Sequence, residues 1–157
     1  MEVKEEYSAV EVALAARRLD LMMAQMHLGL SERMGLSAAE ILALAHLSLE
    51  GALGPTELVR RLHMTTGAMT ALLDRLADRG LVVREPHATD RRRVIVKLTQ
   101  SGTGELVGHV HGMAAEVVEL TGRLSDDERR VVGRFLDDMS ELLARSPAPH
   151  VRADADE

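Results

Sequence analysis

The sequence predicts a mainly α-helical protein with one small β-hairpin. Apolar residues recur at helical spacing over most of the chain, and one pair of alternating, β-branched segments interrupts them between positions 81 and 98. Only 1% of the residues are aromatic, so the core must consist of Leu, Val, Ala and Met, which suits packed helices better than a β-sandwich. The 157 residues are enough for one domain with a core of its own.

A long N-terminal helix is expected over about residues 4–30. Its apolar face contains Tyr7, Val10, Leu14, Leu21 and Leu28, widened by Leu19, Met22, Met23 and Met26. An apolar stripe of this width and length is hard to cover within one small domain. We therefore expect this helix to pack against a second chain as well as its own.

The next two helices carry start signals. Ser37 and Glu40 have the spacing of a capping box, in which the hydroxyl and the carboxylate satisfy free amides of the first turn, and this helix is expected to end near Leu49. Gly54-Pro55 is expected to start a short helix, because proline at the first helical position gives up an amide that would have no partner.

The helix expected at about residues 66–79 has two faces of different character. Thr65 is expected to cap this helix and Gly80 to end it. One face is apolar and the other is small or hydroxylated. They contain, respectively, Met69, Leu72, Leu73 and Leu76, and Thr66, Gly67, Thr70, Ala71 and Arg75. So slim an exposed face suits a helix whose first turns lie deep in the major groove of DNA.

Residues 81–85 and 94–98 alternate as β-strands on either side of a polar loop. We expect Val94, Val96 and Leu98 to anchor this hairpin to the core. The order of helices, turn and hairpin then has a winged helix-turn-helix at its centre.

The hairpin loop carries three adjacent arginines, Arg91, Arg92 and Arg93, behind Asp90. A solvated loop this basic needs an anionic partner, and a narrow minor groove attracts an inserted guanidinium through its strong negative potential. We expect Arg92 to enter the groove and its two neighbours to contact phosphates. Asp90 is expected to brace the wing by pairing with Arg92 or Arg75.

Two further helices are expected after the hairpin, one over about residues 99–121 and one that starts at the capping box of Ser125 and Glu128. The tail after residue 146 is predicted to be disordered. The chain then divides into an N-terminal dimerisation helix at 1–34, a winged helix-turn-helix DNA-binding domain at 35–100, C-terminal dimerisation helices at 101–146 and the tail at 147–157.

The charge is unevenly distributed along the chain. The formal net charge is −6, but residues 54–100 contain nine Arg or Lys against five Asp or Glu, while the segments on either side are acidic. A basic middle between acidic flanks can hold a duplex through the middle and repel it elsewhere. We therefore expect double-stranded DNA as the partner.

The run from Asp90 to Thr99 resembles the wing signature of MarR-type transcription regulators, Asp-x-Arg-x-x-x-Val-x-Leu-Thr, at every fixed position. Further similarities are Glu57-Leu58, Leu72-Leu73-Asp74-Arg75-Leu76 and Arg79-Gly80-Leu81-Val82. The resemblance covers about residues 37–102 by motif, and the flanks by helix order. It implies a homodimer with interlocking terminal helices, a pseudo-palindromic operator, and a small molecule that changes the spacing of the recognition helices.

The resemblance also assigns roles to individual positions. Thr65, Thr66, Gly67 and Thr70 fall where the family contacts the major groove, Arg75 falls at a backbone-contacting or wing-bracing position, and Arg92 is the minor-groove arginine. One departure is Ala71, because many relatives carry a long polar or basic residue there. Base readout is therefore expected to be thin, with more of the affinity coming from phosphates and groove shape.

Methionines and histidines on the long helices have two interpretations each. The methionines are gap fillers, or they form the adaptable wall of a pocket for a small apolar or aromatic effector. That pocket would be lined by Met23, Met26, His27, His46 and Met113. Glu105 and His109 could share a metal ion with His46 or His27, which would make a metal-responsive variant of the regulator. No complete ligand set is evident, so no metal or cofactor is expected.

Other functional classes find little support. The chain has no P-loop, no His-Glu-x-x-His and no nucleophile motif, so an enzyme is not expected. Zero cysteines exclude disulfides, and no apolar run approaches the length of a membrane span, so a cytoplasmic location is expected. The alternative is a winged-helix module that binds only proteins, but such a module would not need three arginines on its wing. We expect a repressor rather than an activator.

Overall fold

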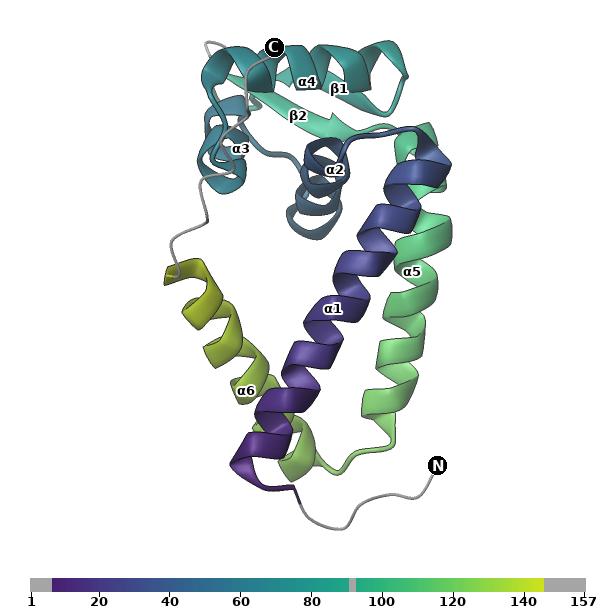
Figure 1. The fold of residues 1–157 in the computed structure, drawn as a ribbon. Coiled ribbons are helices and arrows are strands. Elements are labelled where there is room, and N and C mark those ends of the chain that lie inside the picture. The colour runs from purple at the N-terminus through teal and green to yellow at the C-terminus, as the bar shows by residue number, and fades with distance from the viewer. Residues whose placement is uncertain (1–6, 91–92, 146–157) are drawn as a thin grey trace, which may run out of the picture. The chain divides into compact units, whose positions relative to one another are not determined.

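The computed structural model describes the backbone of residues 7–90 and 93–145, and the side chains of these residues except for positions 103 and 105–114 (Figure 1). The chain divides into two compact units, Met1–Gly108 and His109–Glu157. In chain order the elements are α1 (Ala9–Met34), α2 (Ala38–Glu50), α3 (Pro55–Leu62), α4 (Thr66–Asp78), β1 (Val82–Pro86), β2 (Val94–Leu98), α5 (Gln100–Gly122) and α6 (Asp126–Arg145). The predicted mainly helical winged helix-turn-helix fold is confirmed.

Helix α1 differs at both ends from the expected range. Its N-cap is Ser8, whose hydroxyl accepts from the backbone N–H of Glu11 while the Glu11 carboxylate accepts from the backbone N–H of Ser8. The expected start near Lys4 is therefore wrong, because this capping box fixes the first turn five residues later. The helix continues past Leu30 to Met34 and ends at Gly35, whose φ of 58° is the left-handed conformation that glycine adopts readily.

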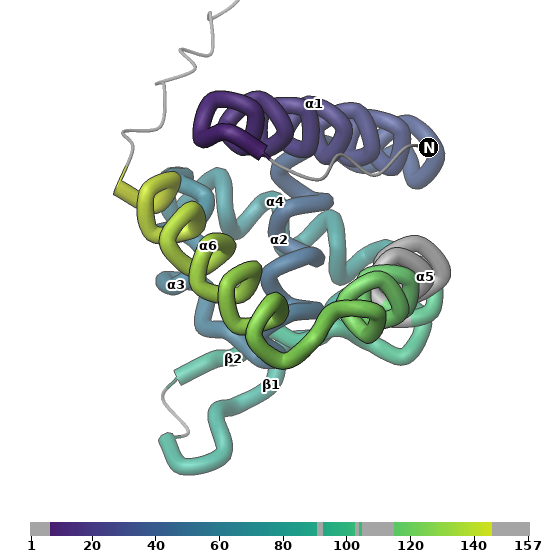
Figure 2. The backbone as a smooth tube through the Cα atoms, turned by 90° about the horizontal axis from the view of Figure 1, so that it is seen from below, coloured from purple at the N-terminus to yellow at the C-terminus, as the bar shows by residue number. Residues whose placement is uncertain are grey.

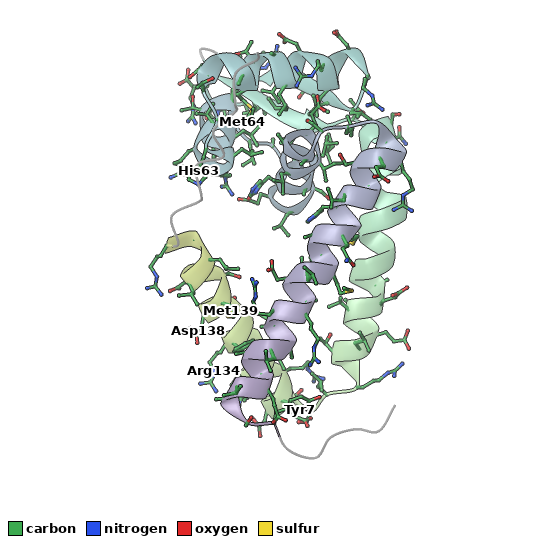
Figure 3. All side chains as sticks on the ribbon, viewed as in Figure 1. Tyr7, His63, Met64, Arg134, Asp138 and Met139 are labelled. Atoms are coloured by element: carbon green, nitrogen blue, oxygen red, sulfur yellow. The ribbon has the colours of Figure 1, made fainter. Side chains whose placement is uncertain are left out.

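The core of the first unit lies between α2, α3, α4 and the hairpin. The apolar face predicted for α4 is buried, with Leu72, Leu73 and Leu76 fully inaccessible to solvent, and Leu44 of α2 and Leu58 of α3 are equally buried. Between α3 and α4 the chain turns through His63, which has a φ of 50°, and Met64 (Figure 3). The backbone N–H groups of both residues bond to the carbonyl of Val59, which closes the turn of the helix-turn-helix.

The hairpin projects from this helical bundle (Figure 2). Strands β1 and β2 pair antiparallel from Val82 opposite Leu98 to Pro86 opposite Val94. Leu53 forms an isolated bridge to Val96, with backbone N···O distances of 3.0 and 2.8 Å. Val96 is fully buried, but Val94 is 45% exposed, so the expectation that Val94 anchors the strand to the core is wrong. It is the first residue of β2, at the end of the strand that adjoins the wing loop.

Helix α5 begins against the backbone that follows α4. The Thr99 hydroxyl accepts from the backbone N–H of Gly102 at 2.9 Å and so caps the helix. A Cβ added to Gly102 would lie 2.0 Å from the carbonyl oxygen of Leu81, so only glycine fits at this position. Among the described residues, no helix is long and apolar enough to cross a membrane.

The long helices leave much apolar surface uncovered within one chain. Leu30 is the buried residue of α1, and the described residues of α6 include no buried one. The exposed apolar side chains of these two helices are Tyr7, preceding α1, Val10, Leu14, Leu19, Leu21, Met22, Met23 and Leu28, and Val131, Val132, Phe135, Leu136, Leu142 and Leu143. These exposed side chains belong to the apolar faces that the sequence predicts for the two helices.

The close approach at Gly102 leads to a stability prediction. Gly102→Ala should lower the free energy of unfolding by about 1–3 kcal/mol, because the added methyl group meets a backbone carbonyl that cannot swing away. Gly104→Ala is the matched control in the same helix, since a Cβ there meets nothing within 4 Å. Urea unfolding at equal protein concentrations measures both variants. Equal stability of Gly102→Ala and the wild-type protein would contradict the close contact.

Candidate nucleic-acid interface

Helix α4 presents the face that the sequence predicts for the major groove. Thr66, Gly67 and Thr70 are exposed, and the Thr65 side chain caps the helix by accepting from the backbone N–H of Ala68 at 3.2 Å. A Cβ at Gly67 would meet nothing within 4 Å, so this part of the helix surface is open to a close-approaching molecule. The Thr70 hydroxyl donates to the Thr66 carbonyl at 3.0 Å and keeps its capacity to accept a further hydrogen bond.

Arg75 is tied to the interior of the unit. Its Nε donates to Oε1 of Glu40 at 2.8 Å, and the Glu40 side chain is 7% exposed whereas that of Arg75 is 58% exposed. Burial raises the pKa of Glu40, but hydrogen bonds from the backbone N–H and hydroxyl of Ser37 and from Arg75 outweigh it, so the pKa lies below its ordinary value. Glu40 therefore stays ionised and holds Arg75 against the start of α2.

This contact bears on the expected brace of the wing. Asp90 was expected to pair with Arg92 or Arg75, and the structure places Arg75 on Glu40 instead. Arg91 and Arg92 lie outside the described residues. The Asp90 carbonyl accepts from the backbone N–H of Arg93 at 2.9 Å, which tightens the turn of the wing. The bracing role of the Asp90 side chain remains a prediction.

The structure shows a link between the wing and α4 that no sequence pattern predicts. Arg84 on β1 forms an ion pair with Asp74 of α4 at 2.6 Å and also donates to the Thr70 carbonyl at 3.3 Å. Asp74 and Arg84 are ten positions apart in the chain, so no helical or strand periodicity connects them. A signal existed only in the opposite charges of the two residues on neighbouring predicted elements.

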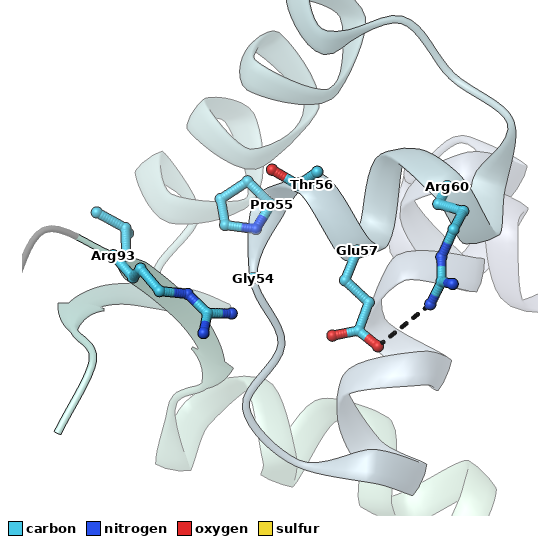
Figure 4. A pocket seen from close by; sticks show the side chains of 7 residues that line it. Gly54, Pro55, Thr56, Glu57, Arg60 and Arg93 are labelled. Carbon is cyan, nitrogen blue, oxygen red and sulfur yellow. Dashed lines mark ion pairs between the residues drawn. The ribbon is translucent and has the colours of Figure 1, made fainter. Parts of the chain in front are cut away.

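Arg93 faces the beginning of α3 across a concave surface. A pocket of about 670 Å³ is lined by Gly54, Pro55, Thr56, Glu57, Arg60, Arg93 and Val94 (Figure 4). The Arg60 guanidinium lies 3.7 Å from the Glu57 carboxylate, and the Arg93 guanidinium extends toward the start of α3. The wing and the first helix of the helix-turn-helix thus meet at one surface that carries two arginines.

The residues expected around an effector come from three helices, α1, α2 and α5. Met23 is 42% exposed on α1, where Met26 and His27 are partly buried. His46 lies on α2, with its Nδ1 3.1 Å from Oε1 of Glu50. The side chain of Met113 lies outside those described, as do those of Glu105 and His109. Among the described side chains, no group of three or more His, Asp or Glu could hold a metal ion.

Comparison with known proteins gives consistent relatives. A family model described as the MarR family matches residues 34–93. An uncharacterized HTH-type transcriptional regulator of Mycobacterium leprae is 38% identical over 112 residues, which cover 71% of this chain and 78% of that protein. The HTH-type transcriptional repressor YetL of Bacillus subtilis is 33% identical over 105 residues, covering 67% of this chain and 63% of that protein.

Solved structures show the same fold. The crystal structure of wild-type apo MarR from Escherichia coli superposes with a TM-score of 0.54 and 26% identity, covering 86% of this chain and 98% of that one.

The Glu40–Arg75 contact predicts how stability depends on pH. Because folding lowers the pKa of Glu40 below its ordinary value of 4.5, the contribution of this carboxylate is present above about pH 4.5 and is lost as the pH falls through the lowered value. Glu40→Gln should reduce stability at pH 7 and flatten this acid loss. Urea unfolding between pH 7 and about pH 3 measures it, with the exposed Glu32→Gln as control. An acid loss in Glu40→Gln equal to that of the wild-type protein would refute the assignment.

Proposed function

The chain belongs to the MarR family of DNA-binding transcriptional regulators, and from this premise we propose that it is a homodimeric cytoplasmic repressor that binds a pseudo-palindromic operator and leaves it when a small-molecule effector binds. The observation that carries the proposal is the slim, exposed face of α4 beside a wing with three adjacent arginines. A module that binds only proteins would not need this combination.

The DNA contacts divide between the two elements. Thr65, Thr66, Gly67 and Thr70 would enter the major groove, where small and hydroxylated side chains let the helix backbone approach the base edges. Arg92 would enter the adjacent minor groove. Because Ala71 adds no long side chain to the α4 surface, the wing and the phosphate contacts would supply a large share of the affinity.

The pocket at the start of α3 suits a DNA phosphate. Arg93 and Arg60 line it together with the first turn of α3, whose helix dipole favours an anion, and Glu57 in the same lining lies 3.7 Å from Arg60. In that turn Pro55 has no N–H and the N–H of Glu57 donates to the Gly54 carbonyl at 3.0 Å, so the N–H of Thr56 is the remaining donor for an anion. We therefore assign Arg93 to the DNA backbone, and Arg91 likewise from its place in the loop.

Dimerisation would cover the apolar surfaces of the long helices. The exposed apolar residues of α1 and α6 are too many for a stable monomer surface, and a two-fold dimer is the commonest way to bury such a patch. It also presents two recognition helices to two half-sites about one helical turn apart.

The name of one relative supports the proposal that the protein is a repressor. The Bacillus relative is named as a repressor. An effector pocket lined by Met23, Met26, His27, His46 and Met113 would take a small apolar or aromatic molecule. A ligand bound there would shift the equilibrium only as far as it prefers one spacing of the recognition helices over another.

The wing gives the first test. The purified protein should retard DNA from its own upstream region in a gel shift, with affinity falling steeply as salt is raised. Arg92→Ala should weaken binding by about tenfold or more, because a groove-inserted arginine contributes roughly 1–3 kcal/mol, and leave the dimer intact. Arg17→Ala, whose side chain is 82% exposed on α1, is the matched control. No retarded band at any salt from a folded dimer would refute DNA binding.

The dimer itself is tested on α6. In analytical ultracentrifugation the chain should sediment as a particle of twice its 17.2 kDa. Phe135→Asp, which places a charge in the proposed interface, should shift the particle to monomer and abolish retardation. Asp138→Ala on the same helix is the control and should remain a dimer. A monomeric wild-type protein at micromolar concentration would contradict the proposal.

A further inference from the structure

The C-terminal end of α4 caps the end of α1. Arg79, the first residue after α4, donates from Nη1 to the carbonyl of Gly35 at 2.9 Å and from Nη2 to the carbonyl of Met34 at 2.7 Å. The last carbonyls of a helix lack partners within it and form the negative end of its dipole, so a guanidinium fork with two donors suits this position. One side chain thereby joins the end of the recognition helix to the end of α1.

The same segment also holds the beginning of α5. Next to Arg79, the carbonyl of Gly80 accepts from the Thr99 hydroxyl at 2.6 Å, and that of Leu81 accepts from the backbone N–H of Thr99 at 3.0 Å. Gly102 packs so closely on Leu81 that a Cβ would lie 2.0 Å from its oxygen. Three consecutive residues, 79–81, thus contact both the end of α1 and the start of α5 (Figure 1).

A third contact fixes the rotation of α4. Arg75 lies four positions before Arg79, on the same side of the helix, and bonds to the buried Glu40 at the start of α2. Moving α4 relative to α1 would break the hydrogen bonds of Arg79, and moving it relative to α2 would break that of Arg75. The buried side chains of Leu72, Leu73 and Leu76 also oppose such motions, because they are packed into the core.

We propose that residues 79–81 form a joint through which α1 and α5 set the position of the recognition helix, and that Arg79 is a positioning residue for operator recognition. The inference rests on the proposed function, because α1 carries apolar surface that we assign to the dimer. The relative placement of two α4 helices in a dimer then depends on how firmly each is held to its own long helices.

An alternative role for Arg79 is direct contact with a DNA phosphate. The two roles predict different salt dependences. Loss of a phosphate contact lowers the magnitude of the slope of log K against log salt by about one, whereas loss of a positioning contact lowers affinity and leaves the slope unchanged. The two roles also predict different geometries of the free dimer. Only the loss of a positioning residue changes the distance between the two recognition helices in the absence of DNA.

The DNA experiment uses the full chain and an operator located by footprinting its own upstream region. Arg79→Ala should lower affinity about tenfold, with an unchanged salt slope and an unchanged dimer mass. It should also lose discrimination against operators with one base pair added between the half-sites. Arg33→Ala is the matched control, because among the described residues the Arg33 side chain bonds only to the carbonyl of Gly29, in its own helix, at 3.3 Å. Unchanged affinity, or a slope reduced by one, would overturn the inference.

A second measurement does not depend on DNA. The chain has no cysteine, so Asp78→Cys places one spin label on the exposed end of each α4. Electron–electron distance measurements on the free dimer should give a narrow distribution with Arg79 present and a broad one in Arg79→Ala. Arg79→Lys, which keeps the charge but not the two-donor fork, should also broaden it and guards against a folding defect of the alanine variant. Equal widths in all three would refute the joint. A wild-type protein that fails to bind DNA refutes the proposed function, and the distances still test the joint.

Discussion

Burial of one face of α4 is the constraint on which the winged unit depends. Leu72, Leu73 and Leu76 have no solvent-exposed surface, and their helix packs against α3 and β1. Because an aliphatic core without large aromatic rings must fill its volume by close interdigitation, this face fixes the rotation of α4 about its own axis. The opposite face is then determined as well. Packing in the core therefore decides which side chains DNA would meet.

Local signals in the sequence predicted most of the helix boundaries. The capping boxes at Ser37 and Ser125, and the cap at Thr65, lie where expected because each depends only on residues within one turn. The start of the first helix differs from the expected one because apolar periodicity gives a face but no end, whereas the capping box of Ser8 and Glu11 sets the first turn. Periodicity locates a helix, whereas a capping side chain gives its first residue.

The sequence predicts which side chains the candidate site exposes. It does not predict which residues those side chains bond to. The exposed face of α4 followed from helical geometry alone. The partners of its charged residues did not, because Glu40 lies 35 positions before Arg75 and the sequence gives no register between α2 and α4. The partners of Arg79 could not be predicted either. They are backbone carbonyls at the end of α1, 44 and 45 positions away, and every residue type has a backbone carbonyl.

Ion pairs between acidic and basic residues also explain how an acidic protein can have positive charge concentrated on its wing. Arg61 bonds to Glu50 and Glu57, Arg75 to Glu40, Arg84 to Asp74 and Lys97 to Glu85. Each of these cations is neutralised by a neighbour, so its field at the DNA surface is weak beyond a few ångströms. Among the described residues Arg93 of the wing forms no ion pair, so its field can reach a duplex. With Ala71 leaving α4 short of long polar side chains, association would be guided first by the wing, and the joint at residues 79–81 would then decide whether both recognition helices fit their grooves together.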